Sequence, residues 1–137
     1  MRRKDSHLPF NINHIHIKSI DPKKTADWWV EAFNFTIVSD VVRDVGDRFI
    51  TCTSENNMIV RISEPVPGQE FNEGDAGLKF GLEHFGLDSS DLDADILRLE
   101  NLGATLLESP RNASSTVRVA FMEVPEKVRI ELIEVKN

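Results

Sequence analysis

Two histidines and one glutamate could bind a metal ion together if the fold brings them to one place. His14 and His84 each fall in a short strand-like run, and Glu131 falls in the last such run of the chain. Neutral imidazoles and a carboxylate are good ligands for Fe(II), Mn(II), Ni(II), Co(II) or Zn(II). Three such ligands leave coordination positions open for water or a substrate, as catalysis requires. These residue types therefore make a metal centre one hypothesis.

The alternation of polar and apolar residues indicates which faces of the strands carry these groups. Side chains alternate across a strand, so His14 and His16 share one face while the intervening isoleucines share the other. By the same reasoning Arg61 and Glu131 lie opposite the apolar residues of their own runs. The alternative is that these polar residues simply face water, as one side of an antiparallel sheet often does.

Two helices are predicted from their start and stop signals. Asp21 is a good N-cap, with Pro22 at the first helical position, and Asn34 can end that helix in a left-handed conformation. Asp91 can cap a second helix, which Gly103 would stop. The predicted order is a strand over 13–18, a helix to about 33, strands over 36–42, 48–53 and 58–63, a strand over 79–88, a helix over 92–102, and strands over 104–108, 116–123 and 128–135.

The second half of this order repeats the first half about 70 residues later. In this repeat His14 is equivalent to His84, and Arg61 is equivalent to Glu131. A period this long is typical of a duplicated supersecondary module. We therefore predict one domain over residues 1–137 with an α+β fold, in which two β-α-β-β-β modules form a cup-shaped sheet with helices outside. The first module covers about 12–64, the linker about 65–78 and the second module about 79–135.

The composition excludes some classes of function. The chain has a net charge of −7, which argues against a nucleic-acid-binding surface. No run approaches the length of a membrane span, and the start lacks a secretory signal. The single cysteine, Cys52, has no base signature near it and is interpreted as structural. We expect a cytoplasmic protein with no membrane or nucleic-acid partner.

Three segments resemble the vicinal oxygen chelate superfamily, which includes glyoxalase I, methylmalonyl-CoA epimerase, extradiol dioxygenases, and fosfomycin- and bleomycin-resistance proteins. They read HIHIKSIDPKKTADWWVEAFNF, HFGLDSSDLDADILRLENLGA and RIELIE. The resemblance covers about 13–135 and implies a divalent metal (Fe, Mn, Ni, Co or Zn), a small-molecule substrate and a homodimer. It also implies that His14, His84 and Glu131 are the first, third and fourth metal ligands.

Arg61 departs from the pattern of that superfamily. It stands where glyoxalases and epimerases usually carry Glu, Gln or His as the second ligand. An arginine remains protonated and offers no lone pair to a metal. Three interpretations stay open: Arg61 binds a carboxylate or phosphate of the substrate, it pairs with Glu131 and replaces the metal, or it points to solvent.

The first functional hypothesis is a glyoxalase-like metalloenzyme of lyase or isomerase type, acting on a small oxygen-bearing substrate. The alternatives are an Fe(II) dioxygenase of extradiol type and a metal-free, resistance-type binding protein. Arg61, His16, Arg48 and Arg118 are the predicted substrate-binding residues, and no catalytic residue is assigned.

Overall fold

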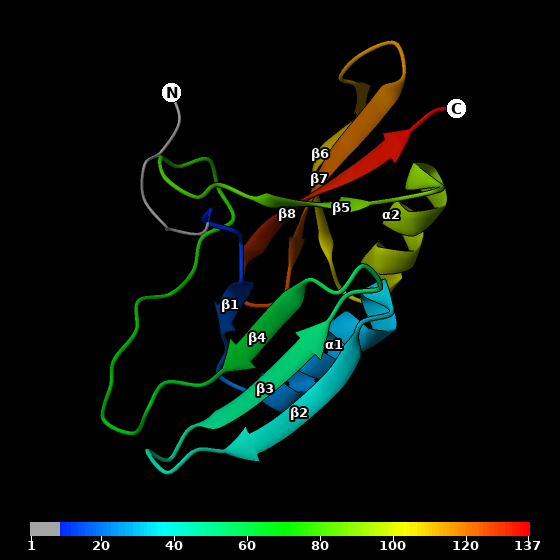
Figure 1. The fold of residues 1–137 in the computed structure, drawn as a ribbon. Helices are drawn as coiled ribbons and strands as arrows, with labels where there is room; N and C mark the ends of the chain where they lie inside the picture. The colour runs from blue at the N-terminus through cyan, green and yellow to red at the C-terminus, as the bar shows by residue number, and fades with distance from the viewer. Residues whose placement is uncertain (1–8) are drawn as a thin grey trace, which may run out of the picture.

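The computed structural model describes residues 9–137, which form two four-stranded mixed sheets, each with one helix (Figure 1). The sheets have the strand orders β1-β4-β3-β2 and β5-β8-β7-β6, and they are open rather than closed. The predicted α+β fold with two equivalent modules is confirmed. The elements are β1 His14–Lys18, α1 Pro22–Phe33, β2 Thr36–Val42, β3 Arg48–Thr53, β4 Ile59–Ser63, β5 Phe85–Asp88, α2 Leu92–Asn101, β6 Thr105–Asn112, β7 Val117–Val124 and β8 Val128–Val135.

The helix boundaries follow the local signals. The Asp21 carboxylate accepts a hydrogen bond from the backbone of Lys24, and Asn34 ends α1 in the left-handed region at φ 58°. The Asp91 carboxylate caps α2 in the same way, and Gly103 follows that helix at φ 102°. Such caps satisfy backbone groups that a helix end leaves unpaired. No helix within residues 9–137 is long and apolar enough to span a membrane.

Two strands of the second module differ from the prediction. The strand expected over 79–88 is shorter, because the chain is irregular up to His84 and Gly81 adopts φ 87°, which breaks an extended run. The strand β6 is longer than expected and continues through Pro110. Proline is tolerated there because β6 pairs only with β7 and is an edge strand. His84 therefore lies immediately before β5 rather than within it.

The two modules share one hydrophobic core. Trp29 of α1 is fully buried and stacks on Phe85 of β5, with ring centroids 5.9 Å apart. Its neighbour Trp28 donates a hydrogen bond from Nε1 to the backbone oxygen of Leu102, at 2.8 Å. Apolar side chains of both sheets continue this cluster. Packing of α1 against the second module therefore helps to fix the orientation of the two sheets relative to each other.

The turn between β7 and β8 fastens the second module to the first. Glu126 and Lys127 both adopt positive φ, at 69° and 56°. The Glu126 carboxylate accepts hydrogen bonds from Ser19 Oγ (3.0 Å) and from the backbone nitrogen of Ile20 (3.2 Å). The linker also packs closely on this turn, since a Cβ atom at Gly74 would lie 2.7 Å from the Glu126 oxygen. The turn thus holds both β1 and the linker in place.

Candidate functional site

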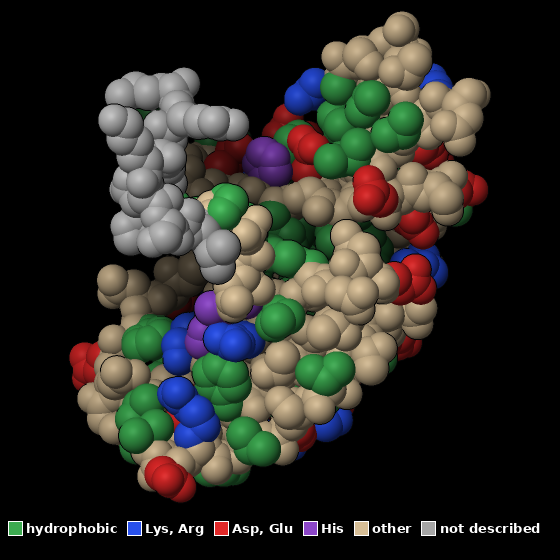
Figure 2. All heavy atoms as spheres, viewed as in Figure 1, with side chains coloured by type: hydrophobic (Ala, Val, Ile, Leu, Met, Phe, Trp, Pro, Cys, Tyr) green, Lys and Arg blue, Asp and Glu red, His purple; other side chains and the backbone are tan. Residues whose placement is uncertain are grey.

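The face of the first sheet that is turned away from α1 carries a cluster of positively charged and polar groups (Figure 2). Strand pairing sets His16 beside Arg61, and Lys18 beside Ser63. His16 Nε2 lies 2.7 Å from Ser63 Oγ, and Lys18 Nζ donates to the same oxygen at 2.9 Å. The ring of Phe49 lies 5.4 Å from the His16 ring and 5.9 Å from the Arg61 guanidinium. These contacts form one connected group on β1, β3 and β4.

The surroundings of His16 favour its neutral form. Burial lowers the pKa of His16, and the positive charges of Lys18 and Arg61 are among the groups that lower it further. Because Lys18 donates to Ser63 Oγ, the serine hydroxyl can donate its own hydrogen to Nε2 of the neutral imidazole. His16 is therefore part of a relay of hydrogen bonds that starts at the Lys18 ammonium.

His14 lies on the same face, next to Arg61. Its Nδ1 is 2.8 Å from Asn13 Oδ1 and 3.5 Å from Arg61 Nη1. The shorter contact favours the tautomer in which Nδ1–H donates to Asn13, which leaves Nε2 with a free lone pair. Arg61 is half-buried and makes no ion pair with Glu131 or any other carboxylate within residues 9–137. Within the described residues of one chain, Arg61 and Glu131 thus do not pair, and the interpretation that such a pair replaces a metal stays a prediction.

The second module carries an acidic counterpart around His84. Its Nδ1 lies 2.8 Å from a Glu83 oxygen, and its Nε2 lies 3.7 Å from Oε2 of Glu131. In Figure 2, histidine surface beside acidic side chains lies apart from histidine surface beside Lys and Arg side chains. A histidine that donates Nδ1–H to a carboxylate and points Nε2 toward a second one has the orientation of a metal ligand.

The predicted triad is not assembled within the described part of this chain. His14 lies with Arg61 on the first module, whereas His84 lies with Glu131 on the second. Across residues 9–137, no three His, Cys, Asp or Glu side chains come together closely enough to hold a metal. The arrangement therefore fits two ligands but not three, and the metal centre stays a prediction.

Arg48 and Arg118 each form an ion pair with a carboxylate of the same module. Arg48 binds Asp40 through two hydrogen bonds, at 2.9 and 2.7 Å. Arg118 binds Asp93 in the same bidentate way, at 3.1 and 3.2 Å. Their predicted contact with a substrate remains a prediction, and it would compete with these ion pairs.

A cavity of about 650 Å³ lies between the modules, under the linker. His16 and Lys18 of β1 line one part of it, and His84 and Arg129 of the second module line another. Phe71 of the linker contributes apolar surface and lies 5.3 Å from the Lys18 ammonium. The volume is within the usual range for small-molecule sites. Sequence reasoning missed Lys18 and Phe71, although Lys18 shares the strand alternation of His16.

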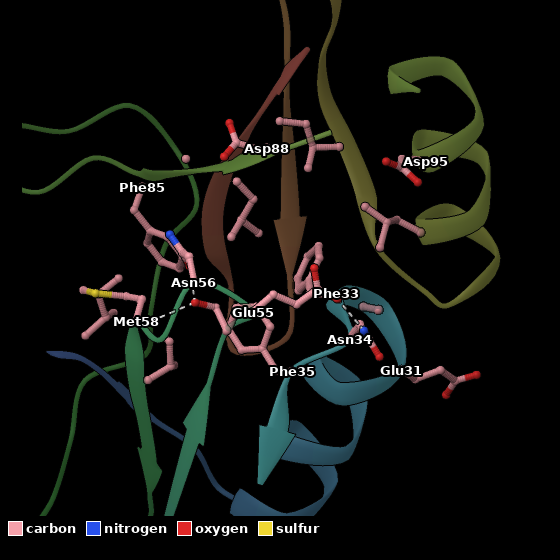
Figure 3. A pocket seen from close by; sticks show the side chains of 18 of the residues that line it. Glu31, Phe33, Asn34, Phe35, Glu55, Asn56, Met58, Phe85, Asp88 and Asp95 are labelled. Atoms are coloured by element: carbon pink, nitrogen blue, oxygen red, sulfur yellow. Dashed lines mark hydrogen bonds between the residues drawn. The ribbon is translucent and has the colours of Figure 1, made fainter. Parts of the chain in front are cut away.

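A second cavity of about 590 Å³ opens at the end of α1 (Figure 3). Phe35 and Phe85 supply apolar lining, while Asp88 and Asp95 add negative charge. None of the predicted site residues lines this cavity. The cavity under the linker is therefore the better candidate, because it holds His16 and His84.

The family model of the Glyoxalase/Bleomycin resistance protein/Dioxygenase superfamily matches residues 11–132. The chain belongs to this superfamily. The resemblance to the vicinal oxygen chelate proteins is thereby confirmed, since this family is part of that group. No curated protein matches the chain at a significant level.

Solved structures of the superfamily share the fold at low sequence identity. A glyoxalase family protein from Bacillus cereus is 14% identical with a TM-score of 0.78, and the match covers 100% of both chains. A mutant of the fosfomycin resistance protein FosX from Listeria monocytogenes, complexed with Mn(II) and 1S,2S-dihydroxypropylphosphonic acid, is 16% identical (TM-score 0.64), covering 91% and 92%. A glyoxalase I mutant from Zea mays is 18% identical (TM-score 0.73), covering 92% of this chain and 45% of that one.

Proposed function

We propose that this superfamily member binds a small organic molecule in the cavity between its modules, and that binding does not require a metal ion. The proposal rests on the cavity of about 650 Å³, which is lined by His16 and Lys18 of the first module and by His84 of the second. Small-molecule sites combine mostly apolar walls with a few polar groups that orient the ligand. Phe71 of the linker and Leu82, which precedes β5, supply such apolar walls.

Independence from a metal is supported by Arg61. Its guanidinium lies 3.5 Å from His14, so a permanent positive charge stands beside one of the three predicted ligands. Arginine cannot coordinate a cation, and its positive charge would repel a metal ion bound to His14. The Arg61 guanidinium favours the binding of organic molecules that carry hydrogen-bond acceptors. The function proposed is therefore metal-free binding, in which the small molecule is held by protein groups alone.

The proposal is tested by measuring the melting temperature of chelator-treated protein in the presence of each compound of a library of small organic molecules. Ligands that bind only the folded state raise its stability, by about 2.7 kcal/mol at a concentration of 100 Kd. We expect ligands that raise the melting temperature without metal, and Leu82→Trp, which narrows the cavity, should abolish the effect. Leu97→Trp is the matched control, because Leu97 is also exposed but lies on α2 outside the cavity. Stabilisation that appears only after a divalent metal is added contradicts the proposal.

A second candidate function is a metal-dependent lyase or isomerase, which the geometry of His84 favours. The Glu83–His84 contact and the 3.7 Å separation of His84 from Glu131 resemble two prepared ligands. A bound Fe, Mn, Ni, Co or Zn ion would polarise an oxygen of the substrate. His14 of a second copy would supply the third ligand, which makes a homodimer part of this candidate.

Metal analysis of the purified protein, before and after His84→Ala, tests this second candidate. Stoichiometric metal that disappears in the variant supports it. Protein that neither contains nor takes up a divalent metal rules it out. Dioxygenase chemistry would use the same three ligands, and oxygen consumption by the Fe(II)-loaded protein separates it from a lyase or isomerase.

A further inference from the structure

Two half-buried cations of the first module have no carboxylate partner. Within residues 9–137, the other Lys and Arg side chains are either exposed or paired with an acidic side chain. Lys18 and Arg61 are neither. A charge that is withdrawn from water without a counter-charge costs free energy. Two such charges on one sheet face of a protein with net charge −7 therefore call for a physical explanation.

The two cations belong to the same connected group of side chains. Lys18 contacts Ser63, Ser63 contacts His16, and His16 is the strand neighbour of Arg61. The acid that comes into this region, Asp47, is fully buried and already taken up by Arg43 through two hydrogen bonds of 2.8 and 2.7 Å. Four other acidic residues line the cavity under the linker, namely Glu73, Asp75, Glu83 and Glu126, and within residues 9–137 none of them forms an ion pair with Lys18 or Arg61.

The hydrogen bonds made by these cations leave donors unused. Lys18 donates two hydrogen bonds, to Ser63 Oγ and to the backbone oxygen of Glu64, which leaves one of its three N–H donors unused. Arg61 has five donors, and its Nη1 only approaches Nδ1 of His14, at 3.5 Å. The group therefore offers several charged donors and needs a ligand that is rich in acceptors.

We infer that Lys18 and Arg61 form an anion subsite, which holds a carboxylate, phosphate or phosphonate group of the molecule that binds in the cavity under the linker. This inference rests on the proposed function, because Lys18 lines that cavity while Arg61 adjoins it through His16. Charge-assisted hydrogen bonds from Lys and Arg are the strong contacts by which proteins hold such groups. We therefore expect the bound molecule to be an organic anion.

Calorimetric titration of the chelator-treated 137-residue chain with phenylphosphonate and with benzoate tests the inference. The two probes distinguish a tetrahedral from a planar oxyanion, and benzyl alcohol is the uncharged control. We expect saturable binding of at least one anion and none of the alcohol. Lys18→Met and Arg61→Met should each weaken binding by about tenfold or more. Lys24→Met and Arg111→Met remove the same charge from exposed positions and should leave the affinity unchanged.

Amide chemical shifts of the unaltered protein locate the probe without relying on any variant. Shifts that centre on His16, Lys18, Arg61 and Ser63 support the subsite. Shifts elsewhere, equal weakening by all four variants, or no binding of either anion overturn it. If uncharged library compounds bind in the cavity while neither anion binds, the subsite fails and the proposed function stands. If an anion shifts the amides of Lys18 and Arg61 but Leu82→Trp leaves its affinity unchanged, the subsite stands and the proposed binding in the cavity under the linker fails.

Discussion

Nη1 of Arg61 lies 3.5 Å from Nδ1 of His14, so a guanidinium borders the first of the three predicted metal ligands. A carboxylate at position 61 would instead offer a second donor beside His14. Arg61→Glu is therefore expected to raise the affinity for Mn(II) or Zn(II) by about tenfold or more, a change of the size that ligand surroundings produce. Calorimetric metal titration of the variant and the unaltered protein measures this change.

Arg111→Glu is the matched control for that experiment, because Arg111 is exposed on β6 and the charge change is identical. An equal gain in both variants would mean that net charge alone attracts the metal. Such a result would contradict the role given to Arg61.

Trp29 joins the modules, and its removal should destabilise both. It is fully buried and contacts Phe33, Phe35 and Phe85. Trp29→Ala should lower the free energy of unfolding by about 3–5 kcal/mol. Trp28→Phe removes a single hydrogen bond to Leu102 and should cost about 1 kcal/mol. Urea denaturation measures both values, and similar values for the two variants would refute the central place of Trp29.

The turn at Glu126 and Lys127 provides a pair of glycine variants with opposite expected signs. Both residues adopt positive φ, which costs a non-glycine residue about 1 kcal/mol. Lys127→Gly should therefore stabilise the protein by up to about that amount. Glu126→Gly gains the same relief but loses the hydrogen bonds from Ser19 and Ile20, so its net effect should be a loss. Thermal unfolding compares them, and stabilisation by both variants would show that the Glu126 contacts contribute little.

Cys52 should resist alkylation in the folded protein. Burial raises the pKa of its thiol to about 11, so the reactive thiolate is scarce at pH 8. The contribution of the raised thiol pKa to the free energy of unfolding is fully present at pH values below the thiol pKa of the unfolded chain. This contribution is lost as the pH rises from there to about 11. Reaction with a thiol reagent at pH 8, with and without denaturant, checks this, and rapid labelling of the folded protein would contradict it.

Local features of this fold could be predicted from the sequence, whereas contacts between modules could not. Asp21, Asn34 and Asp91 act on backbone within a few residues, so their types sufficed to define the helix ends. The stacking of Trp29 on Phe85 joins residues far apart in the chain, and no local pattern encodes that choice.

The candidate site was predictable in its parts but not in its assembly. Strand alternation correctly put His16 and Arg61 on one face, and the repeat made Glu131 equivalent to Arg61. The distance between His14 and the His84–Glu131 pair depends on how the sheets pack, which alternation does not define. The ion pairs of Arg48 and Arg118 were missed because their partners lie on neighbouring elements.

The central claim is that a small molecule binds between the modules without a metal. Its most direct test is calorimetric titration of one cavity ligand into two samples of the same protein, one treated with chelator and one loaded with Mn(II) or Zn(II). We expect the same dissociation constant and 1:1 stoichiometry in both samples. Binding that is lost in the chelator-treated sample and restored by the metal would contradict it.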